Sequence, residues 1–230
     1  MADNRILLQI ALDILTLEQV KSLLTPELLA VVDIVEVGTP LIIRYGLSMV
    51  EKVKSWTEGK KIIFSDTKIV DAGRWETREA LSAGADLVSV LAGASTYTLE
   101  EVRDTAHSEN AQMVVDIIDL SLTDHSKVSF LYSLRPDYLC IHLSSDAVKK
   151  GGSLLEFSQQ LPFVSSRQLP LMVAGGINVT NLPVIVHDLE PAIVVAGSSL
   201  TGAQNPDEEA KKMRRIIDEF IFSRDNSPSD

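Results

Sequence analysis

The chain has only one cysteine, Cys140, among its 230 residues, and it lacks long hydrophobic runs. A single cysteine excludes a disulfide within the chain, which is typical of a cytoplasmic protein. Cys140 lies in an apolar run, and this favours a buried packing role over a reactive one. Because no apolar stretch is long enough to span a membrane and no signal peptide is recognisable, we expect no membrane association.

Positive charge is scarce as well. The chain has 21 lysines and arginines against 32 aspartates and glutamates, which gives a net charge of −11 and a pI near 4.8. Nucleic acids bind cationic surfaces, so this balance argues against a nucleic-acid partner. A small phosphorylated substrate is compatible with it, because backbone amides and helix N-termini can hold phosphate in an acidic protein.

Aromatic residues make up only 5% of the chain, although hydrophobic residues reach 45% in total, mostly Val, Ile, Leu and Ala. This composition favours parallel strands covered by helices over an aromatic-rich β-sandwich. The length fits either one α/β barrel or two smaller domains.

Apolar strand-like runs alternate with helix-like segments in eight strand-then-helix units. The predicted strands are residues 6–12, 31–37, 61–68, 87–91, 113–118, 138–142, 171–174 and 192–196. The predicted helices are residues 17–24, 41–57, 72–82, 98–108, a helix capped by Asp124 and ending at 134, 154–161, one from 179 or 180 to 187, and 206–222.

Strands that alternate with helices form parallel βαβ units. Eight such units without a composition break predict a single-domain (β/α)8 TIM barrel over residues 1–222. The polar residues 223–230 are expected to form a disordered tail. A doubly wound open sheet is the alternative, but its first strand should be followed by a Gly-rich fingerprint, and LDILT (12–16) stands there instead.

The stretch KIIFSDTKIVDAG (61–73) is a short apolar strand that ends in charge. Side chains alternate along a strand, so Asp66 and Lys68 are predicted to share a face, with Asp71 at the start of the next helix. A lysine between two carboxylates stays protonated, which suits a site that binds a metal and an anionic intermediate. The alternative is a surface ion-pair cluster with Asp71 as the helix N-cap.

Ionisable residues interrupt five of the predicted strands near their C-terminal ends, where barrel enzymes place their catalytic groups. Asp33, early in the second strand, is the exception. The strand-end residues are Asp13, Glu36, Asp66, Lys68, Asp116 and His142.

The last two strands end in glycine instead, at Gly175-Gly176 and at Gly197-Ser198. Barrels often bind phosphate through the backbone N–H groups of these two loops, and glycine permits a close approach. These four residues are therefore predicted to bind phosphate, with ordinary tight turns as the alternative.

Six motifs stand in order along residues 6–220: ALD (11–13), EVGTP (36–40), DTKIVDAG (66–73), His142, VAGGI (173–177) and AGSSLTGAQNP (196–206). Together they resemble the orotidine monophosphate decarboxylase superfamily, whose signature is Asp-x-Lys-x-x-Asp. The match is to the branch that contains 3-hexulose-6-phosphate synthase and 3-keto-L-gulonate-6-phosphate decarboxylase.

The resemblance implies a homodimeric barrel with active sites at the subunit interface. It also implies Mg²⁺ as cofactor, held by Glu36 and Asp66, beside an enediolate formed from a phosphorylated sugar. Lys68 would stabilise the enediolate oxygen, and Asp71 of the partner subunit would orient Lys68. Mg²⁺ prefers such oxygen ligands.

The resemblance assigns further roles to the remaining strand-end residues. His142 would act as general base, with a core histidine bonded to a neighbouring carbonyl as the alternative. Asp13 would bind a substrate hydroxyl. Glu36, Asp116 and Ala174 complete the predicted substrate-binding set.

Three positions separate the two sister activities. In this resemblance, the decarboxylases carry Glu, Arg and Thr at the positions where this chain has Asp116, Ser145 and Ala174. The residues present favour the synthase, an aldolase that condenses formaldehyde with D-ribulose 5-phosphate. The alternatives are 3-keto-L-gulonate-6-phosphate decarboxylase or a related sugar-phosphate lyase or isomerase, and a catalytically silent sugar-phosphate-binding barrel.

Overall fold

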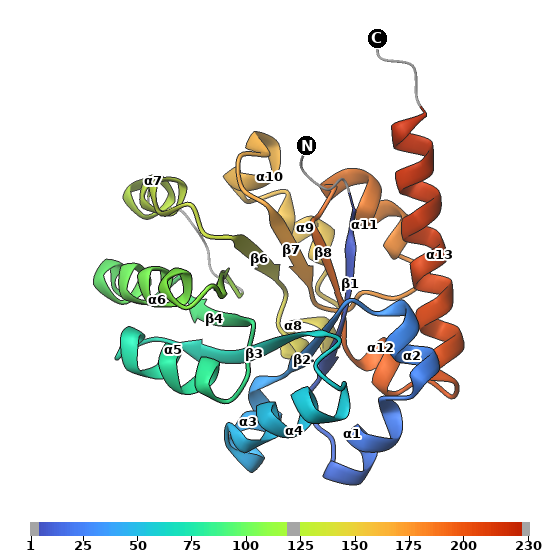
Figure 1. Cartoon of the computed structure of the whole chain (residues 1–230). Coiled ribbons are helices and arrows are strands. Elements are labelled where there is room, and N and C mark those ends of the chain that lie inside the picture. The colour runs from blue at the N-terminus through green and yellow to red at the C-terminus, as the bar shows by residue number, and fades with distance from the viewer. Residues whose placement is uncertain (1–4, 119–124, 227–230) are drawn as a thin grey trace.

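Eight parallel strands close into a barrel that is ringed by helices (Figure 1) in the computed structural model, which describes residues 5–118 and 125–226. Each strand pairs with the next in sequence, and β8 pairs with β1. The predicted (β/α)8 barrel is confirmed. The strands are β1 (Leu7–Leu12), β2 (Ile34–Val37), β3 (Ile62–Ile69), β4 (Leu87–Leu91), β5 (Gln112–Asp116), β6 (Tyr138–His142), β7 (Leu171–Ala174) and β8 (Ile193–Ala196).

The helices fill the connections between the strands, and several of them begin at a residue whose side chain caps the helix. Thr16, for example, forms a capping box with Gln19 at the start of α1. The described helices are α1 (Leu17–Leu23), α2 (Pro26–Val31), α3 (Thr39–Tyr45), α4 (Ser48–Trp56), α5 (Gly73–Ser82), α6 (Thr96–Ser108), α7 (His125–Leu134), α8 (Ser145–Lys149), α9 (Leu154–Ser158), α10 (Pro162–Ser166), α11 (Leu182–Leu189), α12 (Ser198–Thr201) and α13 (Pro206–Asp225).

Two predictions in the first quarter of the chain are wrong. The segment 41–57 is not one helix, because Gly46 adopts a φ of 71° and ends α3 before α4 begins. The predicted second strand starts too early, at Val31, which belongs to α2. The side chain of Thr25 caps α2 and Pro26 stands in its first turn, which together start a helix that the prediction lacks.

Later boundaries also move. The predicted helix 154–161 ends early, at Ser158, and a separate helix, α10, begins at Pro162. Helix α8 is absent from the prediction. Ser144 is its N-cap, and the side chain of Ser144 caps the helix. The last helix continues to Asp225, so residues 223–225 are helical and do not belong to a disordered tail. Asp124 and residues 227–230 lie outside the described residues.

The apolar core forms two layers because side chains alternate across each strand. Ile63 points outward into the layer between strands and helices, whereas its neighbour Phe64 points into the barrel. The interior layer contains Ala11, Ile34, Phe64, Leu87, Val114, Cys140, Met172, Ala174, Ile193 and Val195. Cys140 is 4% exposed and burial raises the pKa of its thiol well above the usual value, which confirms the predicted packing role.

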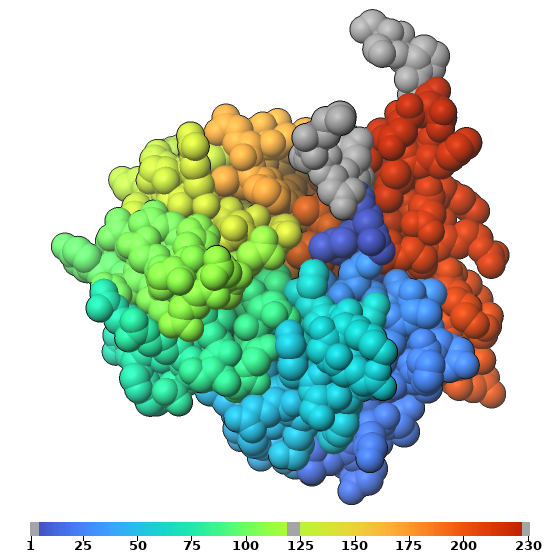
Figure 2. Space-filling view, in the orientation of Figure 1, coloured from blue at the N-terminus to red at the C-terminus, as the bar shows by residue number. Residues whose placement is uncertain are grey.

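Helix α13 lies along one side of the barrel, where it packs against α2 and α11 (Figure 2). Its Arg214 donates from Nη1 to the carbonyl of Ile6 at 3.0 Å and from Nε to the carbonyl of Val31 at 3.2 Å, and it pairs with Asp33. Asp33 also pairs with Arg5. We call Arg5, Asp33 and Arg214 the basal cluster, because it lies where β1 and β2 begin.

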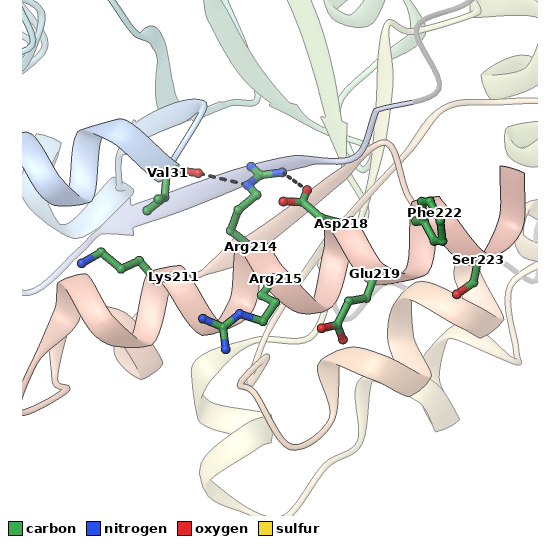
Figure 3. A pocket seen from close by; sticks show the side chains of 8 residues that line it. All are labelled: Val31, Lys211, Arg214, Arg215, Asp218, Glu219, Phe222 and Ser223. Atoms are coloured by element: carbon green, nitrogen blue, oxygen red, sulfur yellow. Dashed lines mark hydrogen bonds and ion pairs between the residues drawn. The ribbon is translucent and has the colours of Figure 1, made fainter. Parts of the chain in front are cut away.

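A hollow of about 610 Å³ adjoins the basal cluster along α13 (Figure 3). Val31 and Arg214 line it, and Arg214 donates to the carbonyl of Ile6, the residue just before β1. It therefore lies at the end of the barrel opposite the strand-end carboxylates. No helix within residues 5–118 and 125–226 has the length and apolarity needed to cross a bilayer.

Candidate active site

The segment around Lys68 does not continue as the regular strand that the sequence predicts. Lys68 has a φ of 49°, and the pairing of β3 with β4 shifts register between Ser65 and Ile69. This β-bulge still turns Lys68 toward Asp66, whose two carboxylate oxygens lie 3.1 and 3.0 Å from Lys68 Nζ. The predicted contact therefore forms through an irregular backbone.

Lys68 lies between two carboxylates, but the second one is not Asp71. Lys68 Nζ is 2.6 Å from Oδ2 of Asp116, which reaches it from β5. Asp71 is exposed and accepts a hydrogen bond from the N–H of Ala72. It is not the N-cap of α5 either, because Ala72 holds that position without a side-chain cap. Asp71 lies just before α5 as expected, but in its own chain it neither flanks Lys68 nor caps the helix, and the role expected for Asp71 of the partner subunit stays a prediction.

Asp116 joins Lys68 to His142, which ends β6. Oδ2 of Asp116 lies 3.0 Å from Nδ1 of His142 and its Oδ1 accepts the N–H of Ile118 at 2.9 Å. Burial alone would raise the pKa of Asp116, but the bond to His142 and the charge of Lys68 hold the pKa below its usual value. We call Asp66, Lys68, Asp116 and His142 the strand-end cluster.

The protonation of the strand-end cluster follows from these contacts. Burial alone would lower the pKa of Lys68, but the charges of Asp66 and Asp116 outweigh burial and hold its pKa well above the usual value. The ionised Asp116 can accept a hydrogen bond from Nδ1–H of His142, and in that tautomer of a neutral imidazole Nε2 carries no proton. The ammonium of Lys68 and Nδ1 of His142 therefore share one carboxylate, that of Asp116.

Glu36 adds a further carboxylate beside the strand-end cluster. Burial raises the pKa of Glu36 well above its usual value, and the charges of Asp66 and Asp13 raise it further. Burial and Asp66 also raise the pKa of Asp13. Gln9 Nε2 donates to Glu36 at 2.6 Å, while the buried Oε1 of Gln9 has no hydrogen-bond partner in the part of the chain that is described.

This donor set fits a divalent cation. Asp66 raises the pKa of Asp13, and both of them raise the pKa of Glu36, so like charges lie close together here, and Lys68 is already shared with a fourth carboxylate. A doubly charged, oxygen-seeking ion would relieve that repulsion.

A different group of possible ligand atoms meets at short range among the described residues. Asp116, Cys140 and His142 each offer one atom within 4.8 Å of the others. A thiol suits softer ions than Mg²⁺, and the ammonium of Lys68 already contacts Asp116. These residues therefore do not replace Glu36 and Asp66 as the predicted Mg²⁺ ligands.

Hydrogen bonds fix Asp66 from two sides, through residues that the sequence analysis does not single out. Thr39 Oγ1 donates to the Oδ2 of Asp66 at 2.8 Å, and Ser89 Oγ donates to its Oδ1 at 2.8 Å. Gln9 supports Glu36 in the same way. Gln9 and Ser89 are polar residues within apolar strands, and that interruption is the signal that could have identified them.

Six of the twelve predicted site residues converge on one small cavity at the C-terminal end of the barrel interior. Its volume is about 20 Å³, roughly the space of a single water molecule. The predicted residues that line it are Glu36, Asp66, Lys68, Asp116, His142 and Ala174.

The predicted phosphate-binding residues follow β7 and β8. Gly175 and Gly176 have φ angles of 108° and 69°, which favour glycine. A Cβ on Gly175 would lie 2.2 Å from the carbonyl oxygen of Leu143, so packing also requires glycine there. Gly197 and Ser198 begin the short helix α12. The turn geometry accounts for Gly175 and Gly176 and leaves a phosphate role untested.

A parallel (β/α)8 barrel with buried ionisable groups at the C-terminal ends of its strands has the architecture of a barrel enzyme. Comparison with known proteins identifies which kind. The chain belongs to the orotidine 5′-phosphate decarboxylase / HUMPS family, whose sequence pattern matches residues 7–213.

Relatives within this family cover almost the whole chain. A 3-hexulose-6-phosphate synthase of Staphylococcus saprophyticus is 33% identical over 92% of this chain and 97% of its own length. The crystal structure of 3-hexulose-6-phosphate synthase from Salmonella typhimurium has a TM-score of 0.85 at 30% identity, covering 93% of this chain and 99% of that one.

A sister activity is also represented. The structure of 3-keto-L-gulonate-6-phosphate decarboxylase from Vibrio cholerae has a TM-score of 0.80 at 25% identity and covers 94% of this chain and 99% of that one. The protein is thus an enzyme of this family, and its similarity to the synthases is the greater of the two.

Proposed function

We propose that the protein is a Mg²⁺-dependent aldolase that condenses formaldehyde with D-ribulose 5-phosphate to give 3-hexulose 6-phosphate. Relatives named as synthases over nearly the full length support this activity. So do Asp116 and Ala174, which line the site cavity at two positions where the synthases resemble this chain.

The observation that carries the proposal is the double contact of Asp116 Oδ2, at 2.6 Å from Lys68 Nζ and 3.0 Å from His142 Nδ1. Because Asp116 holds the proton on Nδ1, Nε2 of His142 can take a proton from C1 of the substrate. Lys68 then places its positive charge beside the enediolate oxygen that becomes negative.

The reaction balances with these two residues. Removal of the C1 proton leaves the electron pair of the broken C–H bond in the enediolate. C1 then forms a bond to the carbon of formaldehyde, and the carbonyl re-forms at the former C2. The oxygen of formaldehyde then receives a proton from protonated His142. This step returns His142 to its neutral form.

Glu36 and Asp66 are the residues proposed to hold Mg²⁺, and Asp13 completes the acidic set. When bound, the ion supplies positive charge that favours a negatively charged sugar-phosphate intermediate. Asp13 is further proposed to accept a hydrogen bond from a substrate hydroxyl.

The substrate phosphate is proposed to bind at the glycines that follow β7 and β8. Gly175, Gly176 and Gly197 leave backbone N–H groups unshielded by side chains, and Ser198 adds a hydroxyl. The last two loops of a barrel are the usual place for such a site.

We further propose a homodimer in which the site borrows Asp71 of the partner subunit. Several large apolar side chains near Asp71 are exposed in the single chain, among them Val70 at 58% and Trp75 at 65%. Exposed apolar surface of this kind favours an interface.

The buried free thiol of Cys140 is consistent with a cytoplasmic location.

The first test is formaldehyde consumption in the presence of D-ribulose 5-phosphate, with and without Mg²⁺, with the Lys68→Ala variant as control. We expect rapid consumption that needs Mg²⁺ and is lost in the variant. If the wild-type protein consumes no formaldehyde, the aldolase proposal fails.

The same preparation then separates the alternatives. Release of CO₂ from 3-keto-L-gulonate 6-phosphate would assign the decarboxylase activity. Thermal shifts with Mg²⁺ and sugar phosphates but no turnover of either substrate would assign a catalytically silent binding barrel.

A further inference from the structure

The bulge in β3 is an unusual structure at the centre of the site. Ser65 pairs with Val88 and Ile69 pairs with Val90, so the three residues 66–68 of β3 lie opposite Ser89 alone. Lys68 adopts a φ of 49°, a left-handed conformation that is costly for a residue with a side chain. Such a conformation persists only where neighbouring groups hold it.

Ser89 provides contacts to both ends of this bulge. Its side-chain oxygen accepts the backbone N–H of Lys68 at 2.8 Å and donates to Oδ1 of Asp66 at 2.8 Å. Ser89 is fully buried on β4, so water does not compete for either bond. One hydroxyl therefore joins the backbone of Lys68 to the carboxylate of Asp66.

We propose that Ser89 is a positioning residue for catalysis, which holds the bulge so that Nζ of Lys68 lies between Asp66 and Asp116. The effect on turnover rests on the proposed aldolase function. The placement of Lys68 does not, because it follows from the contacts of Ser89 alone.

Thr39 serves as a structural contrast to Ser89. It also bonds Asp66, through its carboxylate at 2.8 Å and its backbone carbonyl at 2.7 Å, but no bond from Thr39 to Lys68 is found among the described residues. Loss of the Ser89 hydroxyl would leave Asp66 held by Thr39 while the N–H of Lys68 loses its partner. The predicted consequence is a displaced Lys68 beside an intact Asp66.

Displacement of Lys68 has a specific kinetic signature. The ammonium of Lys68 is proposed to act on charge that develops at the enediolate, so its misplacement lowers kcat more than it raises KM for the sugar phosphate. An error of about 1 Å in a catalytic group can cost about 100-fold in rate. A general loss of folding would also lower the apparent kcat at unchanged KM, so kcat is expressed per folded protein and compared with a control variant.

The experiment compares Ser89→Ala with Ser65→Ala. Ser65 is an equally buried serine on β3 whose hydroxyl has no hydrogen-bond partner among the described residues. We expect kcat to fall about 10- to 100-fold in Ser89→Ala, with KM within about threefold, and to stay within about threefold in Ser65→Ala. Ser89→Thr restores the hydroxyl and is expected to recover most of the rate.

A second readout does not depend on turnover. Brief acetylation followed by mass spectrometry measures how fast Lys68 reacts relative to Lys54, which pairs with Asp86 at 2.7 Å away from the site. The ratio is expected to rise in Ser89→Ala and to stay unchanged in Ser65→Ala. If the wild-type protein turns over neither substrate, the aldolase proposal fails while this ratio still tests Ser89.

Equal kcat losses in the two alanine variants, or an unchanged Lys68 ratio in Ser89→Ala, would overturn the proposal. Ser89→Cys fills the same space with a weak hydrogen-bonding group and serves as the second variant if Ser89→Ala does not fold. It is expected to fall between serine and alanine in both readouts.

Discussion

The two ends of the barrel use buried charge in opposite ways. In the basal cluster, Asp33 is matched by two arginines and also accepts the N–H of Leu8. At the C-terminal end, four carboxylates, Asp13, Glu36, Asp66 and Asp116, share the single ammonium of Lys68. The basal cluster pairs its carboxylate with cations and contributes to stability, whereas the other end has more acidic groups than its one ammonium can pair, and a bound cation or a proton can relieve their repulsion.

The physical lesson is that a buried charge is costly unless it is paired and hydrogen-bonded. Arg214 ties α13 to the segments that precede β1 and β2, so its pairing closes the fold. Glu36 has no cation of its own within the described residues, and burial raises its pKa. An unpaired buried carboxylate of this kind lowers the free energy of unfolding, but it stays available to bind a cation or a substrate.

The largest expected effect comes from removing the proposed base. We expect His142→Ala to lower kcat about 10²- to 10⁴-fold, because general acid–base catalysis typically contributes that much. The melting temperature should change little, since the side chain of His142 is 22% exposed and belongs to the unbalanced end. The measurement is formaldehyde consumption by protein of verified folded fraction.

A matched control exists for this variant. His107 forms a similar pair with Asp137, at 2.9 Å, on the outside of the barrel. His107→Ala should leave kcat unchanged. We expect it still to exchange the C1 proton of ribulose 5-phosphate with D₂O, whereas His142→Ala should lose this exchange. Normal exchange in His142→Ala would rule out His142 as the base.

The basal cluster predicts the reverse pattern. Arg214→Met leaves Asp33 without its more buried partner, and breaking a buried pair typically costs about 3–5 kcal/mol of unfolding free energy. We expect a clear loss in urea denaturation and an unchanged kcat at a temperature where the variant is folded. A large fall in kcat of the folded variant would show that the two ends are coupled.

A smaller effect of opposite sign is expected at Glu36. The folded-state pKa of Glu36 is raised, so the folded protein binds a proton more tightly than the unfolded chain, and stability falls as pH rises from about 4.5 through the raised pKa. Glu36→Gln keeps an acceptor for Gln9 and removes this cost. We expect its melting temperature at pH 7 to rise by roughly 2–4 °C, the shift that 1 kcal/mol produces in a domain of this size.

The same variant tests the metal proposal without an activity assay. Wild-type protein should melt at a higher temperature when Mg²⁺ is added, and Glu36→Gln should show little of that shift. The wild-type stability should also decline between acidic and neutral pH more than that of the variant. An identical Mg²⁺ shift in both proteins would remove Glu36 from the metal site.

Local patterns in the sequence were sufficient for the barrel and for most members of the site. Each strand of a parallel barrel delivers its last residues to the same end, so ionisable residues late in apolar runs predict convergence without any coordinates. Glu36, Asp66, Lys68, Asp116 and His142 were identified in this way, and all of them line the same cavity.

Some errors were avoidable, because the signals were local. Thr25-Pro26 is a cap followed by a first-turn proline, and it predicts α2. Gly46 within the segment 41–57 predicts the break between α3 and α4. The cap at Thr25-Pro26 and the glycine at Gly46 are local signals, so these boundaries can be predicted without tertiary information.

The partners within the site needed more than the sequence. Asp-x-Lys-x-x-Asp draws attention to Asp71, three residues from Lys68, but the carboxylate that contacts Lys68 in its own chain is Asp116, 48 residues away. The bulge opposite Ser89 depends on how β3 and β4 pair, and side-chain alternation along β3 cannot reveal it.

The sequence by itself therefore determined the fold class, the end of the barrel that carries the chemistry and the residue types gathered there. These follow from strand periodicity and from the direction of parallel strands, which are local properties of the chain. Only the tertiary structure decided which carboxylate holds Lys68, which serine holds its backbone and which nitrogen of His142 faces Asp116. Those choices depend on hydrogen bonds of fixed length between different strands, and a one-residue change of register would break them.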